Sequence, residues 1–141
     1  MKNIYTWAAK PAKRTVTVGD LKALKGKKKF TQVTANSTEE ASAAEIAGFD
    51  MIISNAKNVE QVRQGSKNLF LTAALVLNEF VTKEDIMRGA FKALENGADA
   101  VMTPRSMDIV EMLAKEDVPV MGHRAGQSSF LLPHIPPYYP F

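Results

Sequence analysis

The feature of this sequence that most constrains its fold is an alternation of short apolar runs with helix-like segments. The apolar runs, which we expect to be strands, occupy residues 30–35, 49–54, 69–77, 98–103 and 118–122. The segments between them, which we expect to be helices, occupy residues 37–46, 58–64, 83–96 and 106–115. The runs are apolar on both faces, as strands buried on both sides of a sheet should be. Strands alternating with helices over short turns indicate right-handed βαβ units and a parallel sheet.

Capping residues and glycines punctuate this alternation in a repeated way. Ser37 and Thr82 open two helical segments, and Gly48 and Gly97 end them just before the next apolar run, as in AGFDMII and NGADAVM. Stacked βα units have this pattern, so we expect the α/β class and a partial (β/α)8 TIM-type barrel of about four and a half units. An open doubly wound sheet is the alternative. The chain has no G-x-G-x-x-G or G-x-x-x-x-G-K-[ST] motif, so a nucleotide-binding version of that sheet has no support.

The two ends of the chain differ from the alternating part. We expect residues 1–14 to be an irregular arm, residues 15–123 to form the partial barrel and residues 124–141 to be an irregular tail. The barrel part should open with a short helix capped by Thr17, with Asp20 in the capping-box position. The tail contains four of the seven prolines and shows neither a helical nor a strand period.

A barrel of this kind needs eight βα units, whereas this chain supplies about four and a half. Nearly half of a barrel is therefore missing. A half-barrel leaves a strand edge and an apolar face exposed. Three explanations stay open: the chain pairs with another copy or a partner, it is a shortened or frameshifted reading frame, or its tail folds over the open side. The abrupt change of composition after His123 favours the second. The exposed edges predict a homo-oligomer or a partner that covers the open edge.

Composition and charge exclude several classes of protein. The chain has no cysteine, so disulfides and thiolate metal sites are excluded. It has no apolar run of about 18 residues, so no membrane-spanning helix is expected and the cytoplasm is the default location. Residues 1–30 carry nine Lys or Arg and one acid, a net charge of +8, whereas residues 31–141 have a net charge of −5. A basic arm can bind nucleic acid, but the KGKKK lysines lie in a short turn without interleaved aromatic residues, so nucleic-acid binding is not expected.

Several segments, taken in order, resemble those of a known family. They are TVGDLKALKGKKK at residues 17–29, FTQVTA at 30–35, AGFDMII at 47–53, ENGADAV at 95–101 and VPVMGH at 118–123. Together they resemble the N-terminal half of the ketopantoate hydroxymethyltransferases over residues 15–123. The resemblance implies a (β/α)8 barrel that transfers a hydroxymethyl group from methylenetetrahydrofolate to 3-methyl-2-oxobutanoate, with Mg²⁺, in pantothenate biosynthesis.

The chain departs from this family at the positions that the resemblance assigns to metal and substrate. The family's metal-binding Asp and adjacent Ser after the second strand are Ala56 and Lys57 here, and its Asp after the third strand is Ala74. Its Lys and metal-linked Glu at the end of the fourth strand are Met102 and Pro104. Mg²⁺ prefers carboxylate and other oxygen ligands, so we expect no metal, no cofactor and no catalytic residue in this chain.

Polar residues nonetheless follow the predicted strands, at the end where barrel active sites lie. Our candidates for a substrate pocket are Asn36, Asn55, Thr103, Arg105 and His123. Arg105 could hold a carboxylate or phosphate, or it could be a solvated loop residue. His123 could act over the pocket or could tie the strand end to the backbone.

Three functions fit these observations. The first is a divergent hydroxymethyltransferase that is inactive or incomplete as this chain. The second is a non-catalytic half-barrel that serves binding or assembly. The third is a barrel fragment that binds small anions through Arg105.

Overall fold

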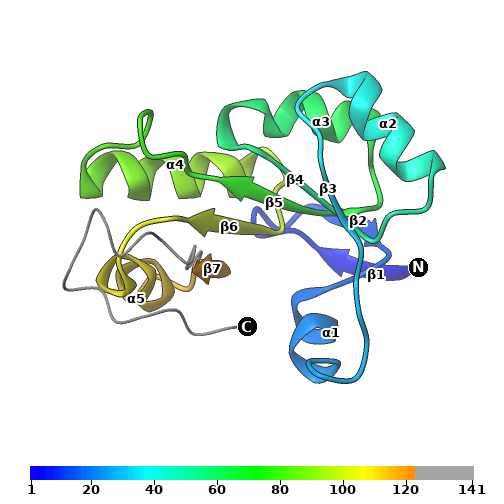
Figure 1. Cartoon of the computed structure of the whole chain (residues 1–141), viewed down its shortest axis with the longest axis horizontal. Coiled ribbons are helices and arrows are strands. Elements are labelled where there is room, and N and C mark those ends of the chain that lie inside the picture. The colour runs from blue at the N-terminus through cyan, green and yellow to red at the C-terminus, as the bar shows by residue number, and fades with distance from the viewer. Residues whose placement is uncertain (123–141) are drawn as a thin grey trace, which may run out of the picture.

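The computed structural model describes residues 1–122 and shows one sheet of five parallel strands (Figure 1). These strands are β3 (Gln32–Thr34), β4 (Met51–Asn55), β5 (Phe70–Ala74), β6 (Ala100–Thr103) and β7 (Val120–Gly122). Each strand pairs in parallel with the next one along the chain, in the order β3-β4-β5-β6-β7. A doubly wound sheet reverses its strand order at a switch point, whereas a barrel wall does not. The described residues therefore form part of a (β/α) barrel, which confirms the predicted fold class.

A helix connects each strand of this sheet to the next. The connections are α2 (Thr38–Ile46), the 3-10 turn η1 (Ala56–Asn58) with α3 (Val59–Gly65), α4 (Lys83–Glu95) and α5 (Met107–Lys115). The predicted caps are confirmed, because the side chains of Ser37 and Thr82 accept hydrogen bonds from backbone N–H groups three residues on. Gly48 and Gly97 follow α2 and α4 with φ of 78° and 107°. Residues with a side chain adopt such positive φ values only with strain, which explains why glycine ends both helices.

The outward face of the sheet and the helices enclose the larger of two apolar cores. Alternate strand residues, among them Ile52, Leu71 and Val101, contribute to this core and are at most 1% exposed. They pack with apolar helix residues, including Ala41, Ala44, Val59, Val62, Ile86, Ala90, Leu94, Ile109 and Leu113. Figure 1 shows α2, α3 and α4 along one side of the sheet. Burying a Leu or Ile side chain contributes roughly 1.5–3 kcal/mol, so this layer fixes the helices on the strands.

The opposite face of the sheet corresponds to the inside of a barrel. A second apolar cluster covers its amino-terminal end: Val16, Met51, Phe70 and Ala100, with Val18, Leu21 and Phe30 packed against them. Helix α1 (Val18–Ala23) contributes to this cluster and begins with the predicted capping box of Thr17 and Asp20. Figure 1 shows α1 on the side of the sheet away from α2, α3 and α4, so α1 closes the bottom of the half-barrel.

The N-terminal arm is not irregular, which corrects the prediction for residues 1–14. It forms an antiparallel hairpin of β1 (Lys2–Tyr5) and β2 (Pro11–Arg14). The connecting turn is closed by a hydrogen bond from the Ala9 N–H to the Thr6 carbonyl at 2.8 Å. No apolar alternation marks these short strands, and for that reason the sequence does not reveal them.

Tertiary contacts explain why the hairpin forms. The Trp7 ring stacks on Phe91 of α4, with the ring centroids 5.4 Å apart. At the end of β2, Arg14 is 3% exposed and bonds to Asp99. Both partners lie far along the chain, so the hairpin depends on the assembled barrel rather than on local preference.

Two further predictions have different outcomes. The strand predicted at residues 69–77 ends at Ala74, because the chain turns at Val76, whose carbonyl accepts from the Phe80 N–H at 3.1 Å. The predicted irregular tail, 124–141, lies outside the described residues, as does His123. None of the helices within residues 1–122 is long and apolar enough to cross a bilayer.

Candidate functional site

One row of residues crosses the inner face of the sheet at the carboxyl ends of its strands. Asn55 pairs with Ala74, Ala74 with Met102, and Met102 with Met121. Paired residues on neighbouring strands point to the same face, so these side chains lie where barrel active sites are found. The row offers one amide, one methyl group and two thioethers, and it carries no charge.

A polar cluster beside this row brings two of the predicted site residues together. The Asn36 side-chain oxygen accepts hydrogen bonds from the Asn55 N–H at 2.8 Å and from the Asn58 amide at 3.2 Å. The Asn55 side chain accepts from the Lys57 N–H at 2.9 Å and donates to Glu79 at 3.2 Å. The Lys57 ammonium lies 3.4 Å from the same carboxylate. These groups bond to one another, and the Lys57 and Glu79 charges balance.

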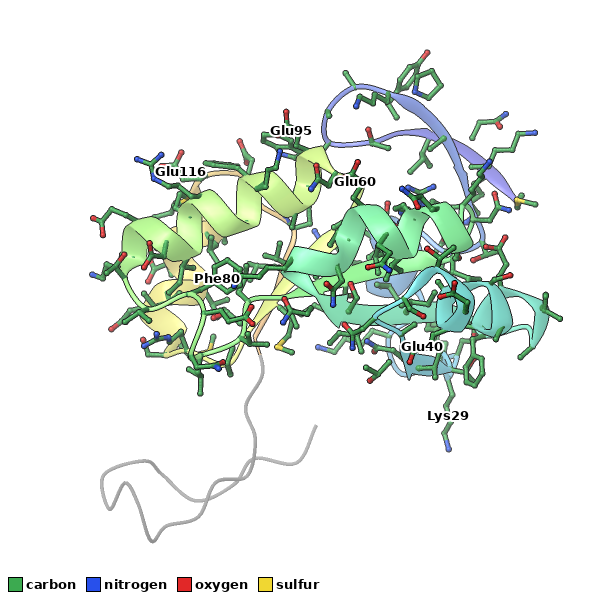
Figure 2. The ribbon with its side chains drawn as sticks, turned by 90° about the horizontal axis from the view of Figure 1, so that it is seen from above. Lys29, Glu40, Glu60, Phe80, Glu95 and Glu116 are labelled. Atoms are coloured by element: carbon green, nitrogen blue, oxygen red, sulfur yellow. The ribbon has the colours of Figure 1, made fainter. Side chains whose placement is uncertain are left out.

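Arg105 and Thr103 also take part in internal hydrogen bonds. Thr103 is fully buried, and its hydroxyl oxygen accepts from the Arg105 N–H at 3.2 Å. The Arg105 guanidinium donates through Nη2 to the carbonyls of Phe80 at 2.9 Å and Val81 at 3.0 Å. Figure 2 shows Phe80 beside α4, where Gly89 leaves room for its ring. Through Nη2, Arg105 therefore fastens the loop between β5 and α4.

The buried charges gather at the other end of the strands, which the sequence reasoning missed. Asp99, just before β6, accepts hydrogen bonds from Arg14 Nε at 2.9 Å, from Arg63 Nη2 at 2.5 Å and from the Leu71 N–H at 2.9 Å. All three charged side chains are at most 12% exposed. Burial lowers the pKa of Arg63 to about 10, and the Asp99 carboxylate acts in the opposite direction. A signal was present in the sequence, because a charged residue in an apolar strand run requires a partner.

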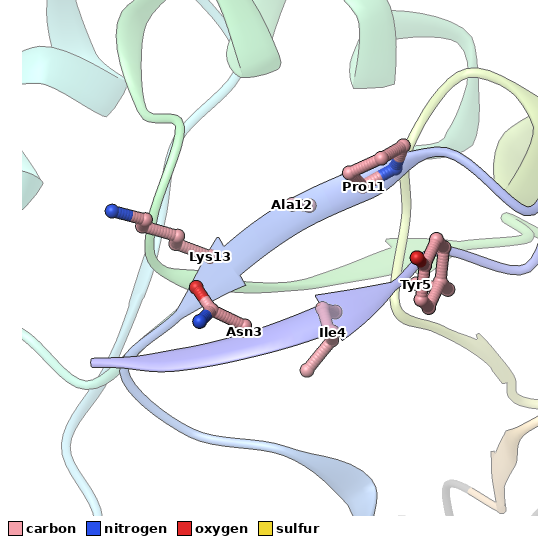
Figure 3. Close-up of a pocket in the computed structure, with 6 residues that line it drawn as sticks. All are labelled: Asn3, Ile4, Tyr5, Pro11, Ala12 and Lys13. Carbon is pink, nitrogen blue, oxygen red and sulfur yellow. The ribbon is translucent and has the colours of Figure 1, made fainter.

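Two hollows of the surface that residues 1–122 form lie by the hairpin. One, of about 310 Å³, runs along β1 and β2 between Ile4, Tyr5 and Pro11 (Figure 3). The other, of about 340 Å³, lies between the hairpin and the bottom of the half-barrel and is bordered by Trp7 and Arg14.

Comparisons with known proteins find relatives named 3-methyl-2-oxobutanoate hydroxymethyltransferase. No protein-family model matches the chain. The curated 3-methyl-2-oxobutanoate hydroxymethyltransferase of Deinococcus radiodurans is 33% identical over 121 residues, which covers 67% of this chain and 43% of the relative. The one from Pyrobaculum calidifontis is 32% identical over 136 residues, covering 79% and 51%. The one from Pyrococcus furiosus is 28% identical over 135 residues, covering 78% and 48%.

This chain is a divergent relative of the 3-methyl-2-oxobutanoate hydroxymethyltransferases. It spans about half the length of the curated relatives it matches. Among solved structures, a putative deoxyribose-phosphate aldolase from Coccidioides immitis matches with a TM-score of 0.43 and 16% identity, over 63% of this chain and 39% of that one. So remote a likeness adds nothing to the fold, which rests on the strand order.

The hydroxymethyltransferase resemblance implies Mg²⁺, and the residues of this chain do not fit that ion. The positions that match the family's metal-binding carboxylates hold Ala56, Ala74 and Pro104. Glu79 approaches the row, but it is already paired with Lys57. Within residues 1–122, no three His, Cys, Asp or Glu side chains gather as a metal site. Mg²⁺ keeps oxygen ligands in near-octahedral geometry, and the described residues at the carboxyl ends of the strands form no such set.

Proposed function

We propose that this chain is a non-catalytic half-barrel that serves binding or assembly and performs no Mg²⁺-dependent hydroxymethyl transfer by itself. The observation that supports this most is the uncharged row of Asn55, Ala74 and Met102 across the carboxyl ends of the strands. Removing a proton beside the carbonyl of a 2-oxo acid needs a cation on that acid and a carboxylate base. The row supplies neither, and the polar groups beside it are paired with one another. We therefore expect no cofactor for this chain.

The proposed binding surface is the open side of the half-barrel. β3 and β7 are the outermost strands of the described sheet, so each has one edge without a strand neighbour there. Gln32 and Thr34 on β3 are exposed, and Ile53 and Met121 on the inner face are half-buried. Unpaired strand edges are templates for pairing with another chain. We propose that a second copy of this chain covers the open side, and that it does so in the cytoplasm.

A thermal-shift experiment tests the loss of metal-dependent chemistry. The full chain is heated with MgCl₂, with 3-methyl-2-oxobutanoate, and with both, and the Pyrococcus furiosus relative serves as positive control. A ligand at a hundredfold excess over its Kd stabilises a protein by about 2.7 kcal/mol, which raises Tm by several degrees. We expect no shift in this chain. A rise that requires both compounds together would contradict the proposal.

Sedimentation velocity tests the proposed assembly. We expect a dimer at micromolar concentration, and we expect Thr34→Pro to shift it toward monomer, because proline removes a backbone donor and stiffens the edge of β3. The control is Lys29→Pro, in the exposed turn before β3. Thr31→Pro would be unsuitable as a control, because the Thr31 N–H bonds to Asp50. A monomer at all concentrations would contradict self-association, and a complex only with a different protein would favour a hetero-partner.

The small-anion alternative has less support. It depends on Arg105, whose Nη2 is bound to the carbonyls of Phe80 and Val81. A phosphate titration that stabilises the chain, and that Arg105→Met abolishes, would revive it.

A further inference from the structure

The cavity beneath the hairpin is built differently from the carboxyl-end row. It holds about 340 Å³, which is within the range of about 300–1,000 Å³ typical of small-molecule sites. Its floor includes Val16, Phe70 and Ala98, each at most 3% exposed. Tyr5 and Trp7, 76% and 47% exposed, form part of its rim. The cavity thus combines a fixed apolar floor with accessible aromatic rings.

Arg14 is a charged group that borders this cavity with unused hydrogen-bonding capacity. Its side chain is 4% exposed. Its Nε bonds to Asp99, and its Nη1 donates to the carbonyls of Lys13 at 2.9 Å and Lys67 at 2.8 Å. None of the hydrogen bonds found within residues 1–122 uses Nη2, so the guanidinium is rigidly held and keeps donors to spare.

Asp99 also borders the cavity, but its capacity is used. Its two carboxylate oxygens accept from Arg14 twice, from Arg63 Nη2 and from the Leu71 N–H. Two guanidinium groups therefore share one carboxylate. Glu45 offsets part of the positive charge on the side of Arg63, where it accepts from Asn68 at 2.7 Å, and it does not line the cavity. The unfilled capacity of the Arg14–Asp99 pair is that of a cationic donor.

We propose that this cavity is a binding site for a small, flat, apolar carboxylate. The apolar body packs between the floor and the rings of Tyr5 and Trp7, and the carboxylate receives hydrogen bonds from Arg14 Nη2. Charge-assisted hydrogen bonds from arginine to carboxylate are about twice as strong as neutral ones, so the Arg14 contact selects the anion. Figure 3 shows Tyr5 and Ile4 on β1, which border this cavity as well as the hollow of the hairpin. The site lies at the end of the strands opposite to the uncharged row, and it does not depend on the proposed function.

The chain contains one tryptophan, and it borders the cavity, so its fluorescence reports occupancy. Benzoate is titrated into the full chain at constant ionic strength, and benzamide, its neutral counterpart of the same shape, is titrated in parallel. We expect a saturable change of Trp7 emission with benzoate and a Kd at least about tenfold higher with benzamide. Equal affinities, or no saturation with benzoate up to its solubility limit, would overturn the proposal.

Two leucine substitutions in α1 locate the binding. Gly19 lines the cavity, and a Cβ there would meet Thr17 Oγ1 at an ordinary 3.6 Å, so a side chain can begin at this position and Gly19→Leu is designed to fill the space. Ala23→Leu places the same side chain on the same helix at a residue that does not line the cavity. We expect Gly19→Leu to abolish the benzoate signal and Ala23→Leu to keep it, with circular dichroism confirming that both variants fold. Retention of the signal in a folded Gly19→Leu variant would place binding elsewhere and refute the site.

Discussion

The two ends of the parallel strands handle charge in opposite ways. At the amino ends, Arg14 and Arg63 converge on Asp99, and all three side chains are nearly buried. At the carboxyl ends, the row that includes Ala74 and Met102 is uncharged. Barrel enzymes place catalytic groups at the carboxyl ends and rely on the amino ends for stability. The buried charges of this chain therefore lie at the end of the strands that supports stability, whereas the inner-face row at the other end holds an amide, a methyl group and two thioethers.

The largest expected effect comes from breaking the charged end. Asp99→Asn leaves two buried guanidinium groups without their carboxylate, and removing one partner of a buried pair destabilises by about 3–5 kcal/mol. Urea unfolding followed by circular dichroism measures the change. The control is Glu111→Gln, which removes an exposed pair with Lys115 and should change stability by less than about 1 kcal/mol. An equally small loss of unfolding free energy for Asp99→Asn would show that the ion pairs of Asp99 do not stabilise the fold.

The second effect concerns the loop at the opposite end. Arg105→Met removes two hydrogen bonds from a guanidinium to the backbone of the β5–α4 loop. Hydrogen bonds to charged groups contribute about 1.5–3 kcal/mol to stability. Chymotrypsin should then cut faster at residues 77–80. Arg88→Met, an exposed position on α4, is the matched control and should leave the cutting rate unchanged. Equal rates in the two variants would mean that Arg105 does not fasten the loop.

A smaller effect is expected within the polar cluster. Asn55→Ala removes the side chain that accepts from the Lys57 N–H and donates to Glu79, which should destabilise by about 1 kcal/mol. Asn78→Ala, exposed in the following loop, should be neutral. Urea unfolding of both variants measures the difference, which is read from the denaturant midpoints when the m-values are equal. A loss as large as that of Asp99→Asn would remove the contrast between the two ends.

The smallest effect depends on pH. Hydrogen bonds from Thr31, from its backbone N–H first and its hydroxyl next, hold the pKa of Asp50 below its ordinary value of 3.8. The folded state thus favours the ionised carboxylate, so the resulting stability is fully present above the unfolded pKa and is lost as the pH falls through the lower folded pKa. Asp50→Asn should reduce the loss of unfolding free energy at acid pH by less than about 1 kcal/mol, because the side chain is partly exposed and solvent screens it. Unfolding series between neutral pH and pH 2 measure it, with Asp108→Asn as control. An equal fall of the unfolding free energy with decreasing pH in wild type and Asp50→Asn would contradict the lowered pKa of Asp50.

Much of the fold could be predicted because its signals are local. The caps Ser37 and Thr82 and the glycines 48 and 97 act within a few residues of the helix ends that they set. The site was predicted less completely. The sequence placed Asn36 and Asn55 at strand ends, but it could not show that they bond to each other or that Arg105 bonds to the loop before α4.

The sequence by itself determined the alternation of strands and helices, their approximate bounds, and the absence of carboxylates at Ala56 and Ala74, since all of these are properties of short segments. Only the tertiary structure decided that β1 and β2 form a hairpin and that Arg14 is buried against Asp99, 85 residues further along the chain. The physical reason is the range of the interactions. Caps and glycine turns act between neighbours in the chain, whereas a buried ion pair exists only once the sheet has brought distant segments together.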